Sequence, residues 1–328
     1  MFNKKNILIT GGTGSFGQEC VKFLSENYKP NKIIIFSRDE NKQYEMQKTF
    51  TGKNIRFFIG DIRDKERLRV AMREVNYVIH AAALKHVPIA EYNPTECIKT
   101  NINGAENLVE TAIEAKVERV LALSTDKAVD PVNLYGATKL CAEKLFIAAN
   151  NLAGKMNTRF SVVRYGNVLS SRGSVLPFYL DLLKKEINTF PITDVRMTRF
   201  FINLPDAVKF VLKSMQLMKK GEIFIPKMPS FKIQDLAYTL NPKVRLKKIG
   251  MRPGEKLHEM LISEMDSAHT YELNDLYIIL PEILKSNWSN LRRVKTGFIY
   301  KSNVNKNFFD KKYIKKLLQK SKINISRK

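Results

Sequence analysis

A chain of 328 residues, 44% of them hydrophobic, is long enough to bury a large core and to form two folding units. No apolar run approaches the roughly 20 residues that a membrane-spanning helix needs, and residues 1–6 are too polar to begin a signal peptide. Cys20, Cys97 and Cys141 lie far apart, with neither metal-ligand spacing nor a disulfide pattern. We therefore expect a cytoplasmic protein without a metal site.

The formal net charge of +24 is concentrated near the C-terminus, where residues 285–328 hold 14 lysines and arginines against one acidic residue, Asp310. Such a segment suits either an anionic partner or a compositional bias with solvated lysines. We favour the bias and expect no nucleic-acid partner, because no nucleic-acid-binding motif is recognisable. Residues 308–318 predict a basic amphipathic helix, for which packing on its own protein is favoured over membrane contact.

The first predicted strand, residues 6–10, runs directly into the glycine-rich segment 11–17, and apolar residues then recur at helical spacing. Strand, glycine turn and helix are the context of a dinucleotide-binding motif. In such a motif Gly11 lets the chain turn tightly, Gly14 lets backbone amides approach a pyrophosphate, and Gly17 lets helix and strand pack closely. The predicted cofactor contacts here are Gly11, Thr13, Gly14, Ser15, Phe16 and Gly17.

The end of the second predicted strand, residues 32–36, decides between two nicotinamide cofactors. Arg38 can pair with a ribose 2′-phosphate, whereas Asp39 can accept a hydrogen bond from a 2′-hydroxyl group. Because Ser37 and Arg38 come first, NADP is favoured, and Asp39 leaves NAD open. The alternative interpretation is that Arg38 only caps the next helix.

Two further strands, residues 55–59 and 77–81, continue the alternation of strands and helices and predict an α/β fold with a doubly wound parallel sheet. Asp61, followed by Ile62, can meet an adenine amino group or cap a helix. Small residues from Ala81 onward allow a cofactor to lie against the backbone. Residues 92–115 predict one long helix that carries Thr100 and Asn101 towards either the core or the cofactor.

The candidate catalytic residues follow the fifth predicted strand, residues 119–123. Thr125, Asp126 and Lys127 follow its carboxyl end, while Tyr135 and Lys139 share one face of the next helix. Ligands bind at the carboxyl ends of strands in open α/β sheets, so a phenol, a carboxylate and two ammonium groups meet at one crevice. This set is typical of acid–base catalysis, although Asp126 and Lys127 by themselves also suit a local ion pair.

Beyond the strand at residues 159–165 the alternation decays, and prolines punctuate shorter elements. Three basic clusters, at residues 164–173, 196–199 and 252–256, suit a substrate that carries phosphates, although each alone suits a solvated loop. We expect a nucleotide-binding domain at residues 1–165, a substrate lobe at 166–281 with some return to the first domain, and a basic segment at 282–328.

These motifs allow a family to be named. The glycine motif with the Tyr135–Lys139 pair resembles the extended short-chain dehydrogenase/reductases, which implies a Rossmann-type domain with a smaller C-terminal α/β lobe. More narrowly, the chain resembles the inverting UDP-N-acetylglucosamine 4,6-dehydratases. That resemblance covers residues 6–281 and rests on segments 37–40, 81–88, 96–101, 124–128, 163–168, 197–200 and 252–258.

The resemblance implies UDP-N-acetylglucosamine as substrate, tightly held NADP, a homo-oligomer, and a role in flagellin glycosylation or surface polysaccharide synthesis. Asp126-Lys127 indicates inversion at C5, because relatives that retain C5 configuration carry Asp-Glu there. Lys139 is expected to lower the pKa of Tyr135, which takes the C4 hydroxyl proton assisted by Thr125. Neutral Lys127 would remove the C5 proton, and protonated Asp126 would donate to the departing C6 hydroxyl group.

The substrate contacts that the resemblance implies are Lys85, Asn167, Val168, Arg172, Arg199, Arg252 and Glu255, with Lys85 also a candidate contact at the cofactor edge. Two rival functions stay open at this point. One is a UDP-sugar 4- or 5-epimerase, which would share the glycine loop, Tyr135 and Lys139 but would not eliminate water. The other is a cofactor-binding regulator whose basic C-terminal segment binds nucleic acid, with a steep dependence on salt.

Overall fold

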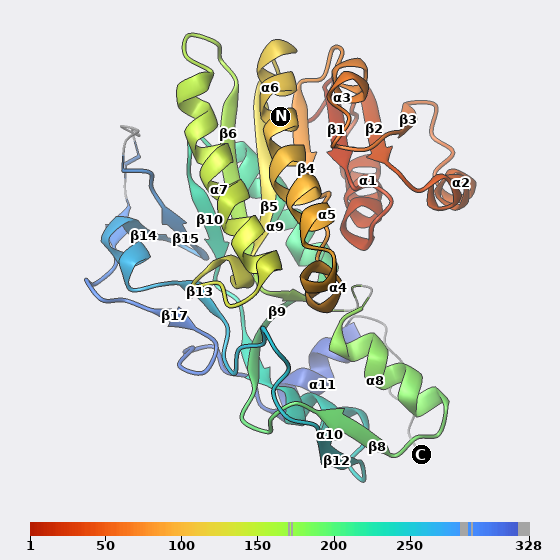
Figure 1. Cartoon of the computed structure of the whole chain (residues 1–328), viewed down its shortest axis with the longest axis vertical. Helices are drawn as coiled ribbons and strands as arrows, with labels where there is room; N and C mark the ends of the chain where they lie inside the picture. The colour runs from red at the N-terminus through yellow and green to blue at the C-terminus, as the bar shows by residue number, and fades with distance from the viewer. Residues whose placement is uncertain (170, 172, 283–287, 290, 321–328) are drawn as a thin grey trace.

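A large sheet flanked by helices stands above a smaller lobe in the computed structural model of the chain (Figure 1). The structure describes residues 1–169, 171, 173–282, 288–289 and 291–320. Within these ranges no helix combines the length and the apolar character needed to cross a membrane.

The large sheet has ten strands in the order β16-β14-β15-β10-β6-β5-β4-β1-β2-β3. All neighbours from β3 to β10 pair in parallel, and β15, β14 and β16 extend the sheet with antiparallel pairs. The parallel strands are β1 (Asn6–Thr10), β2 (Lys32–Ser37), β3 (Ile55–Ile59), β4 (Tyr77–His80), β5 (Arg119–Thr125), β6 (Arg159–Tyr165) and β10 (Ile223–Pro226), and the antiparallel ones are β14 (Thr270–Leu273), β15 (Leu276–Ile279) and β16 (Arg292–Arg293).

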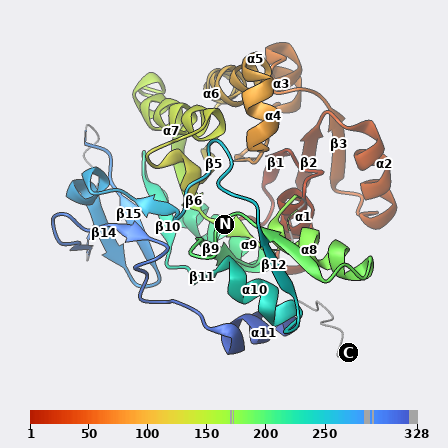
Figure 2. The ribbon, with the colours of Figure 1, turned by 60° about the horizontal axis from the view of Figure 1, so that its bottom comes forward.

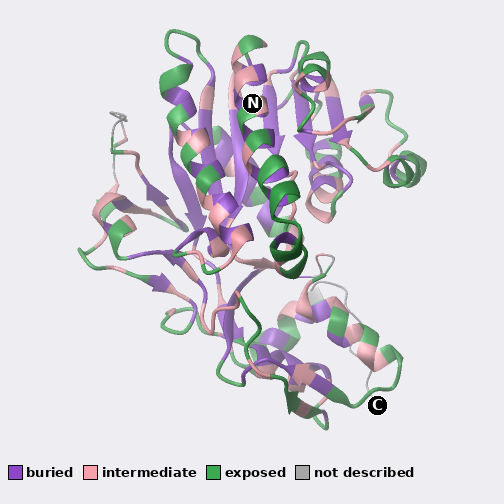
Figure 3. Cartoon of the chain, viewed as in Figure 1, coloured by how far each residue is buried: buried purple, intermediate pink, exposed green. Residues whose placement is uncertain are grey.

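Two layers of helices cover the sheet, so its central strands are buried on both faces (Figures 2 and 3). This burial explains their continuous apolar runs, such as Ile-Leu-Ile in β1. On one face α6 packs between α3 and α7, and on the other α1 packs against α9. The bounds are α1 (Ser15–Asn27), α2 (Glu40–Thr49), α3 (Lys65–Ala71), α6 (Gly104–Glu114), α7 (Leu134–Leu152) and α9 (Leu204–Leu217). The predicted doubly wound parallel sheet is confirmed.

The prediction of a single helix over residues 92–115 is wrong. The structure has α4 (Val87–Tyr92), α5 (Pro94–Ile98), a wider π-helical turn (Lys99–Asn103) and α6 in succession. Pro94 cannot continue α4, because proline lacks the amide N–H and its ring clashes with the preceding turn, so a new helix begins there. The π turn then changes the direction in which Thr100 and Asn101 point relative to a regular α-helix.

The lobe has its own hydrophobic core, which includes Tyr179, Phe190, Phe201 and Phe231. It contains the sheet β11-β9-β7, the pair β12-β8, and the helices α8, α10 and α11. The bounds are β7 (Asn167–Val168), α8 (Val175–Lys184), β8 (Thr189–Ile192), β9 (Thr198–Ile202), β11 (Ser230–Lys232), α10 (Ile233–Leu240), β12 (Arg245–Lys248) and α11 (Lys311–Lys320), with β13 (Met260–Ile262) pairing with β17 (Tyr300–Lys301) beside it.

The basic C-terminal helix α11 packs on the lobe. Ile314 and Leu318 are fully buried in the lobe core, where α11 lies against α10. Its apolar face is therefore covered by its own protein, which is the packing that the sequence favours over membrane contact.

Candidate active site

A cavity of about 630 Å³ opens at the carboxyl ends of the parallel strands. Two groups of predicted residues line it, the cofactor contacts and the catalytic candidates. From the predicted cofactor set, the lining includes Gly11, Thr13, Gly14, Ser15, Phe16, Gly17, Ser37, Arg38, Asp39, Asp61, Ile62, Ala81, Lys85, Thr100, Tyr135 and Lys139. The topology thus gathers residues from five separate strand ends into one site, as parallel sheets do.

The glycine-rich turn forms the floor of the cavity. Gly11 has a φ of +65°, and a Cβ atom there would lie 2.9 Å from the Cα atom of Ala82. The turn after β1 therefore passes close to the backbone after β4, an approach that a side chain would prevent. The N-terminus of α1, which begins at Ser15, faces the same cavity and favours negative charge.

Three cationic side chains and two carboxylates lie near the end of β2. Thr13 Oγ1 and Ser37 Oγ are 2.7 Å apart, and Arg38 lies 3.5 Å from the Asp61 carboxylate. Asp39 caps α2 by accepting a hydrogen bond of 2.9 Å from the amide of Lys42, whose ammonium group also pairs with the Asp39 carboxylate. Asp61 accepts hydrogen bonds from Arg63, which outweigh the effect of burial and hold the pKa of Asp61 below its usual range.

Thr100 and Asn101 have different surroundings. Thr100 lines the cavity, whereas the Asn101 amide is clamped in the core. Its Oδ1 atom accepts from the amide of Leu84 at 2.8 Å, and its Nδ2 atom donates to the Leu84 carbonyl at 2.9 Å and to Thr138 at 3.0 Å. Asn101 therefore fixes the loop after β4, and this loop places Lys85 in the lining of the cavity. Burial, together with the charge of Lys127, lowers the pKa of Lys85.

The catalytic candidates after β5 form a tight local cluster. Thr125 Oγ1 accepts from the Lys127 amide at 3.3 Å and donates to Asp126 Oδ1 at 3.0 Å. Lys127 Nζ donates to the same Asp126 oxygen at 3.0 Å, and the Asp126 side chain is fully buried. Burial, reinforced by the nearby Glu259 carboxylate, raises the pKa of Asp126 despite the Lys127 charge.

The helix α7 brings Tyr135 and Lys139 to this cluster. Asn133 caps the helix by accepting from the amide of Gly136 at 2.7 Å. A Cβ atom at Gly136 would lie 2.2 Å from the carbonyl oxygen of Lys127, so only glycine lets α7 approach so closely. Lys139 is buried and donates a hydrogen bond of 2.8 Å to the Leu123 carbonyl, and burial lowers its pKa to about 8.

Two electrostatic expectations meet opposing effects in this structure. Burial alone would lower the pKa of Lys127, but Asp126 and Glu259 outweigh it and raise that pKa, which favours the ammonium form of Lys127. Burial raises the pKa of Tyr135 to about 12, and the opposing influences are the Lys127 charge and a hydrogen bond with Thr125. The proton-transfer roles therefore depend on the whole cluster and not on Lys139 or on burial alone.

The predicted substrate contacts fall into two groups. Asn167 and Val168 line the cavity with Lys85, whereas in the described part of the chain Arg199, Arg252 and Glu255 lie outside that lining. Arg199 is buried and donates to the carbonyl groups of Thr198 and Leu257 at 2.8 and 3.2 Å. Arg252 and Glu255 hydrogen-bond to each other through a turn at the lobe's edge. The prediction for Arg172 falls outside the described residues.

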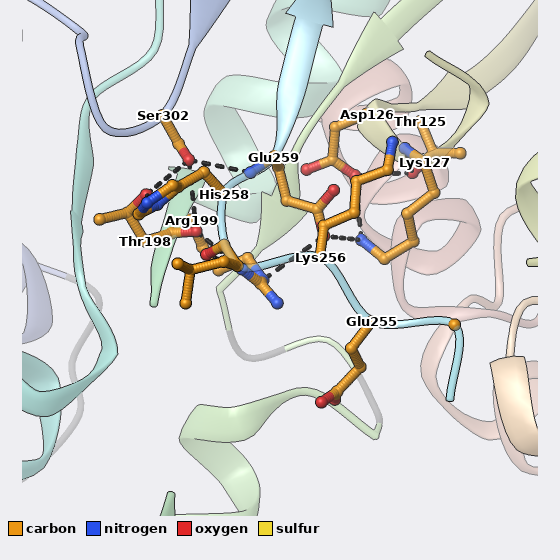
Figure 4. A network of polar contacts seen from close by, with 12 residues as sticks. Thr125, Asp126, Lys127, Thr198, Arg199, Glu255, Lys256, His258, Glu259 and Ser302 are labelled. Atoms are coloured by element: carbon orange, nitrogen blue, oxygen red, sulfur yellow. Dashed lines mark hydrogen bonds and ion pairs between the residues drawn. The ribbon is translucent and has the colours of Figure 1, made fainter. Parts of the chain in front are cut away.

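Sequence reasoning missed a buried carboxylate from the lobe. Glu259 lies directly before β13, is 2% exposed, and places Oε1 3.5 Å from both Lys127 Nζ and Arg199 Nε (Figure 4). Its position, one residue beyond the motif at 252–258, was a signal that it belongs to the same loop. Its role in the cluster emerges only from a contact between residues 132 positions apart.

Comparisons with known proteins agree with this geometry. The family model described as "polysaccharide biosynthesis protein" matches residues 7–281. The chain belongs to this family. Across 315 residues it is 60% identical to the inverting UDP-N-acetylglucosamine 4,6-dehydratase of Campylobacter jejuni, an alignment that covers 93% of this chain and 94% of that protein. The resemblance predicted from the motifs is confirmed.

Two further proteins are similar to this chain over most of its length. The X-ray structure of Pen from Bacillus thuringiensis matches with a TM-score of 0.92 and 38% identity, over 99% of this chain and 100% of that one. A UDP-glucose 4-epimerase of Rickettsia bellii is 44% identical over 286 residues, which are 85% of this chain and 84% of that protein. The relatives of this chain therefore include a protein named as a dehydratase and one named as an epimerase, and the residues of the site must separate the two.

Proposed function

We propose that this protein is a hydro-lyase, an inverting 4,6-dehydratase of UDP-N-acetylglucosamine. The expected product is UDP-2-acetamido-2,6-dideoxy-β-L-arabino-hex-4-ulose, for pseudaminic acid-type flagellin glycosylation or surface polysaccharide synthesis. The observation that carries the proposal is the Asp126–Lys127 pair: Asp126 is fully buried, and its partner Lys127 lines one cavity together with Tyr135, Lys139 and the dinucleotide motif. The 60% identity to the enzyme from Campylobacter jejuni supports the same substrate.

A nicotinamide dinucleotide fits the residues of the cavity. Gly11 allows the close backbone approach that a pyrophosphate needs, and the α1 N-terminus supplies positive potential. We propose NADP in preference to NAD, since Arg38 and Lys42 line the cavity at the end of β2 while Asp39 is engaged as a helix cap. When bound, the cofactor supplies reversible hydride transfer, to and from the sugar.

Tyr135, Thr125 and Lys139 are assigned to the C4 hydroxyl group. Tyr135 takes the C4 proton, Thr125 hydrogen-bonds the C4 oxygen, and Lys139 holds the nicotinamide ribose. The hydrogen bond with Thr125 and the Lys127 charge both act against the burial that raises the pKa of Tyr135. Tyr135 therefore relies on these two neighbours to release its proton.

Asp126 and Lys127 are assigned to the elimination across C5 and C6. The bond of 3.0 Å between Lys127 Nζ and Asp126 Oδ1 is short enough for a proton to pass from the ammonium group to the carboxylate. That transfer converts the ion pair into a neutral amine and a carboxylic acid without changing the number of protons. The amine can then remove the C5 proton, and the acid can protonate the departing C6 hydroxyl group.

The substrate's uridine diphosphate is assigned to the lobe side of the cavity. We propose that Asn167, Val168 and Lys85 contact the substrate directly, and that Arg172, Arg199, Arg252 and Glu255 complete the lobe's part of the site. We also propose the division into a nucleotide-binding domain (1–165), a lobe (166–281) and a basic C-terminal segment (282–328).

A cytoplasmic homo-oligomer is part of the proposal. The exposed apolar side chains of Ile89 and Tyr92 on α4 and of Val132 before α7 are candidates for contacts between copies. Sedimentation analysis of the purified protein would test this assignment, and a monomer at all concentrations would contradict it.

A UDP-sugar 4-epimerase is the second candidate, favoured by the 44% identity to the enzyme of Rickettsia bellii. An epimerase shares Tyr135, Lys139 and the cofactor but has no use for an acid–base pair at C5 and C6. A proton NMR time course with UDP-N-acetylglucosamine in D₂O separates the two. We expect a new 6-methyl signal, deuterium at C5 and L-arabino coupling constants. A product whose 6-hydroxyl group is intact would favour the epimerase, and retained C5 configuration would contradict inversion.

A further inference from the structure

The lobe closes over the catalytic loop through three polar contacts. Asn133 Nδ2 donates to the Gly254 carbonyl at 2.7 Å, Lys256 Nζ donates to the Val129 carbonyl, and Glu259 Oε1 lies 3.5 Å from Lys127 Nζ. The first two contacts each join a side chain to a backbone carbonyl group and fix the relative position of loop and lobe. The third differs, because it places a buried carboxylate beside a side chain that the proposed function assigns to catalysis.

The pairing of Glu259 is incomplete for a structural ion pair. Both of its cationic neighbours, Lys127 and Arg199, stand at 3.5 Å, and Arg199 is already bonded to two backbone carbonyl groups. Among the described residues, Glu259 Oε2 and Asp126 Oδ2 are both buried without a hydrogen-bond partner. Two buried carboxylates thus share one ammonium group, and each keeps an unused oxygen (Figure 4). Such pairs are costly in stability and are typical of functional sites.

We propose that Glu259 is a positioning residue of the reaction, the fixed anion of the lobe that determines how Asp126 and Lys127 divide their proton. The inference rests on the proposed function, because that function gives the pair its roles. Two carboxylates that flank one ammonium group repel each other, so ionisation of one disfavours ionisation of the other. Glu259 is the better candidate for the permanent anion, since Arg199 and Lys256 both add positive charge on its side.

The pKa shifts agree with this division. The charges of Lys127, Arg199 and Lys256 outweigh burial and lower the pKa of Glu259, whereas the pKa of Asp126 is raised. The charged and titratable groups around Lys127 come from every element packed against it: Asp126 on its own turn, Tyr135 on α7, Lys85 after β4, Arg199 on β9, and Lys256 and Glu259 before β13.

Glu259 therefore raises the pKa of both Asp126 and Lys127. Removing its charge should shift the pH–rate profile in the same direction whichever of the two residues limits the rate. In Glu259→Gln, Lys127 gives up its proton at lower pH and Asp126 also ionises at lower pH. The limb of the pH–rate profile that depends on neutral Lys127 and the limb that depends on protonated Asp126 both move to lower pH. The whole pH–rate profile of elimination should shift to lower pH by about one unit or more, as expected for the loss of a charge within roughly 4–6 Å.

The experiment compares two partial reactions of the full-length protein with UDP-N-acetylglucosamine between about pH 5.5 and about pH 10. This range extends roughly one unit beyond each expected limb of the pH–rate profile. Deuterium incorporation at C5 follows the elimination, and absorbance of the reduced cofactor follows oxidation at C4. In Glu259→Gln we expect the C5 profile to move while the pH dependence of C4 oxidation stays in place. Glu259→Asp keeps the charge and should restore the wild-type pH optimum at a reduced rate.

Glu222→Gln is the matched control. Glu222 is fully buried, lies outside the lining of the cavity, and accepts hydrogen bonds from Ser161, Trp288 and two backbone amides. Its loss should lower stability without moving either pH profile. A Glu259→Gln profile that keeps its optimum, with both partial reactions slowed equally, would overturn the inference and leave a structural role. A wild-type protein that oxidises C4 without water loss would instead contradict the proposed function.

Discussion

Two clusters of acidic and basic side chains lie near the carboxyl end of β5, one reached through Ser124 and the other through Asp126 and Lys127, and they differ in how completely they are paired. In the first, Arg164 donates to both oxygens of Glu143 at 3.1 and 2.7 Å, and Ser124 donates to Glu143 at 2.5 Å. The other face of Arg164 bonds Asp266 at 3.0 Å and the Leu261 carbonyl at 2.9 Å. We call this cluster the Arg164 clamp.

The second cluster consists of Asp126, Lys127, Arg199 and Glu259, and it leaves two carboxylate oxygens without partners among the described residues. We call it the Lys127 cluster. The Arg164 clamp ties β5, β6 and α7 to the segment around β13, whereas the Lys127 cluster contributes little comparable bonding. Complete pairing indicates a structural role, and incomplete pairing marks the groups that are available for chemistry.

The largest expected effect comes from breaking the Arg164 clamp. Arg164→Met leaves the Glu143 carboxylate buried with Ser124 as its remaining partner, so we expect the free energy of unfolding to fall by about 3–5 kcal/mol. Urea denaturation followed by circular dichroism measures this loss. Lys127→Met should change stability by no more than about 1 kcal/mol, because Asp126 can take up a proton and functional groups are seldom placed for stability. Equal losses for the two variants would remove the distinction between the clusters.

A change at Gly136 displaces the Lys127 cluster without removing any of its charges. In Gly136→Ala the added methyl group would lie 2.2 Å from the Lys127 carbonyl oxygen, so helix or loop must shift. We expect a loss of roughly 1–3 kcal/mol in stability and at least about a tenfold slower incorporation of deuterium at C5. The control Ala137→Gly lowers helix propensity by about 1 kcal/mol but leaves the contact intact, and its C5 exchange should stay near the wild-type rate.

The pH dependence of C4 oxidation reports on Lys139, which donates a hydrogen bond to the Leu123 carbonyl of β5. Its pKa is lowered to about 8 by burial, opposed by the Glu143 charge, so the ammonium group is lost as the pH rises through about 8. Cofactor reduction should therefore decline above that pH, by up to about tenfold per unit. A rate that stays flat to pH 10, roughly two units above the expected limb, would show that the Lys139 charge is not required.

Unfolding does not explain such a decline. Between pH 8 and the ordinary lysine pKa of 10.5, the unfolded chain binds more protons at this position than the folded protein does. The contribution of Lys139 to the free energy of unfolding therefore rises with pH across that window. Denaturation curves at each pH provide the check.

The smallest expected effect is at the outer edge of the Arg164 clamp. The Asp266 side chain is 27% exposed, so solvent screens its pair with Arg164. Asp266→Asn should lower stability by about 1 kcal/mol, well below the loss in Arg164→Met, with unchanged pH profiles for both partial reactions. A loss as large as that of Arg164→Met would show that pairing, and not burial, sets the strength of this cluster.

The sequence predicts well what is encoded in contiguous segments. The glycine turn, the residues after β2, β3 and β5, and the Tyr135–Lys139 spacing each depend on a strand end or one helical face, so their meeting at one cavity follows from the parallel sheet. The continuous helix over residues 92–115 was mispredicted because helical periodicity survives a break at Pro94 and a π turn.

The protonation behaviour of Lys127 could not be predicted from the sequence, for a different reason. They are set by Glu259, which enters the site only when the lobe folds over the loop after β5. Some return of the lobe region to the first domain is expected from the sequence, but the elements that return are not: α9 packs against α1, and β10 pairs with β6 in the large sheet. No local pattern encodes such long-range contacts, and charge–charge distances decide the protonation state.

A single-turnover experiment with Lys127→Met in D₂O tests most directly whether the Lys127 cluster performs the chemistry. The variant keeps Tyr135, Lys139 and the cofactor residues, so oxidation at C4 should proceed and the absorbance of reduced cofactor should appear and persist. The sugar should keep its original hydrogen at C5 and its 6-hydroxyl group. A 6-methyl product with deuterium at C5, formed at the wild-type rate, would contradict the assignment of Lys127 and with it the contrast between the two clusters.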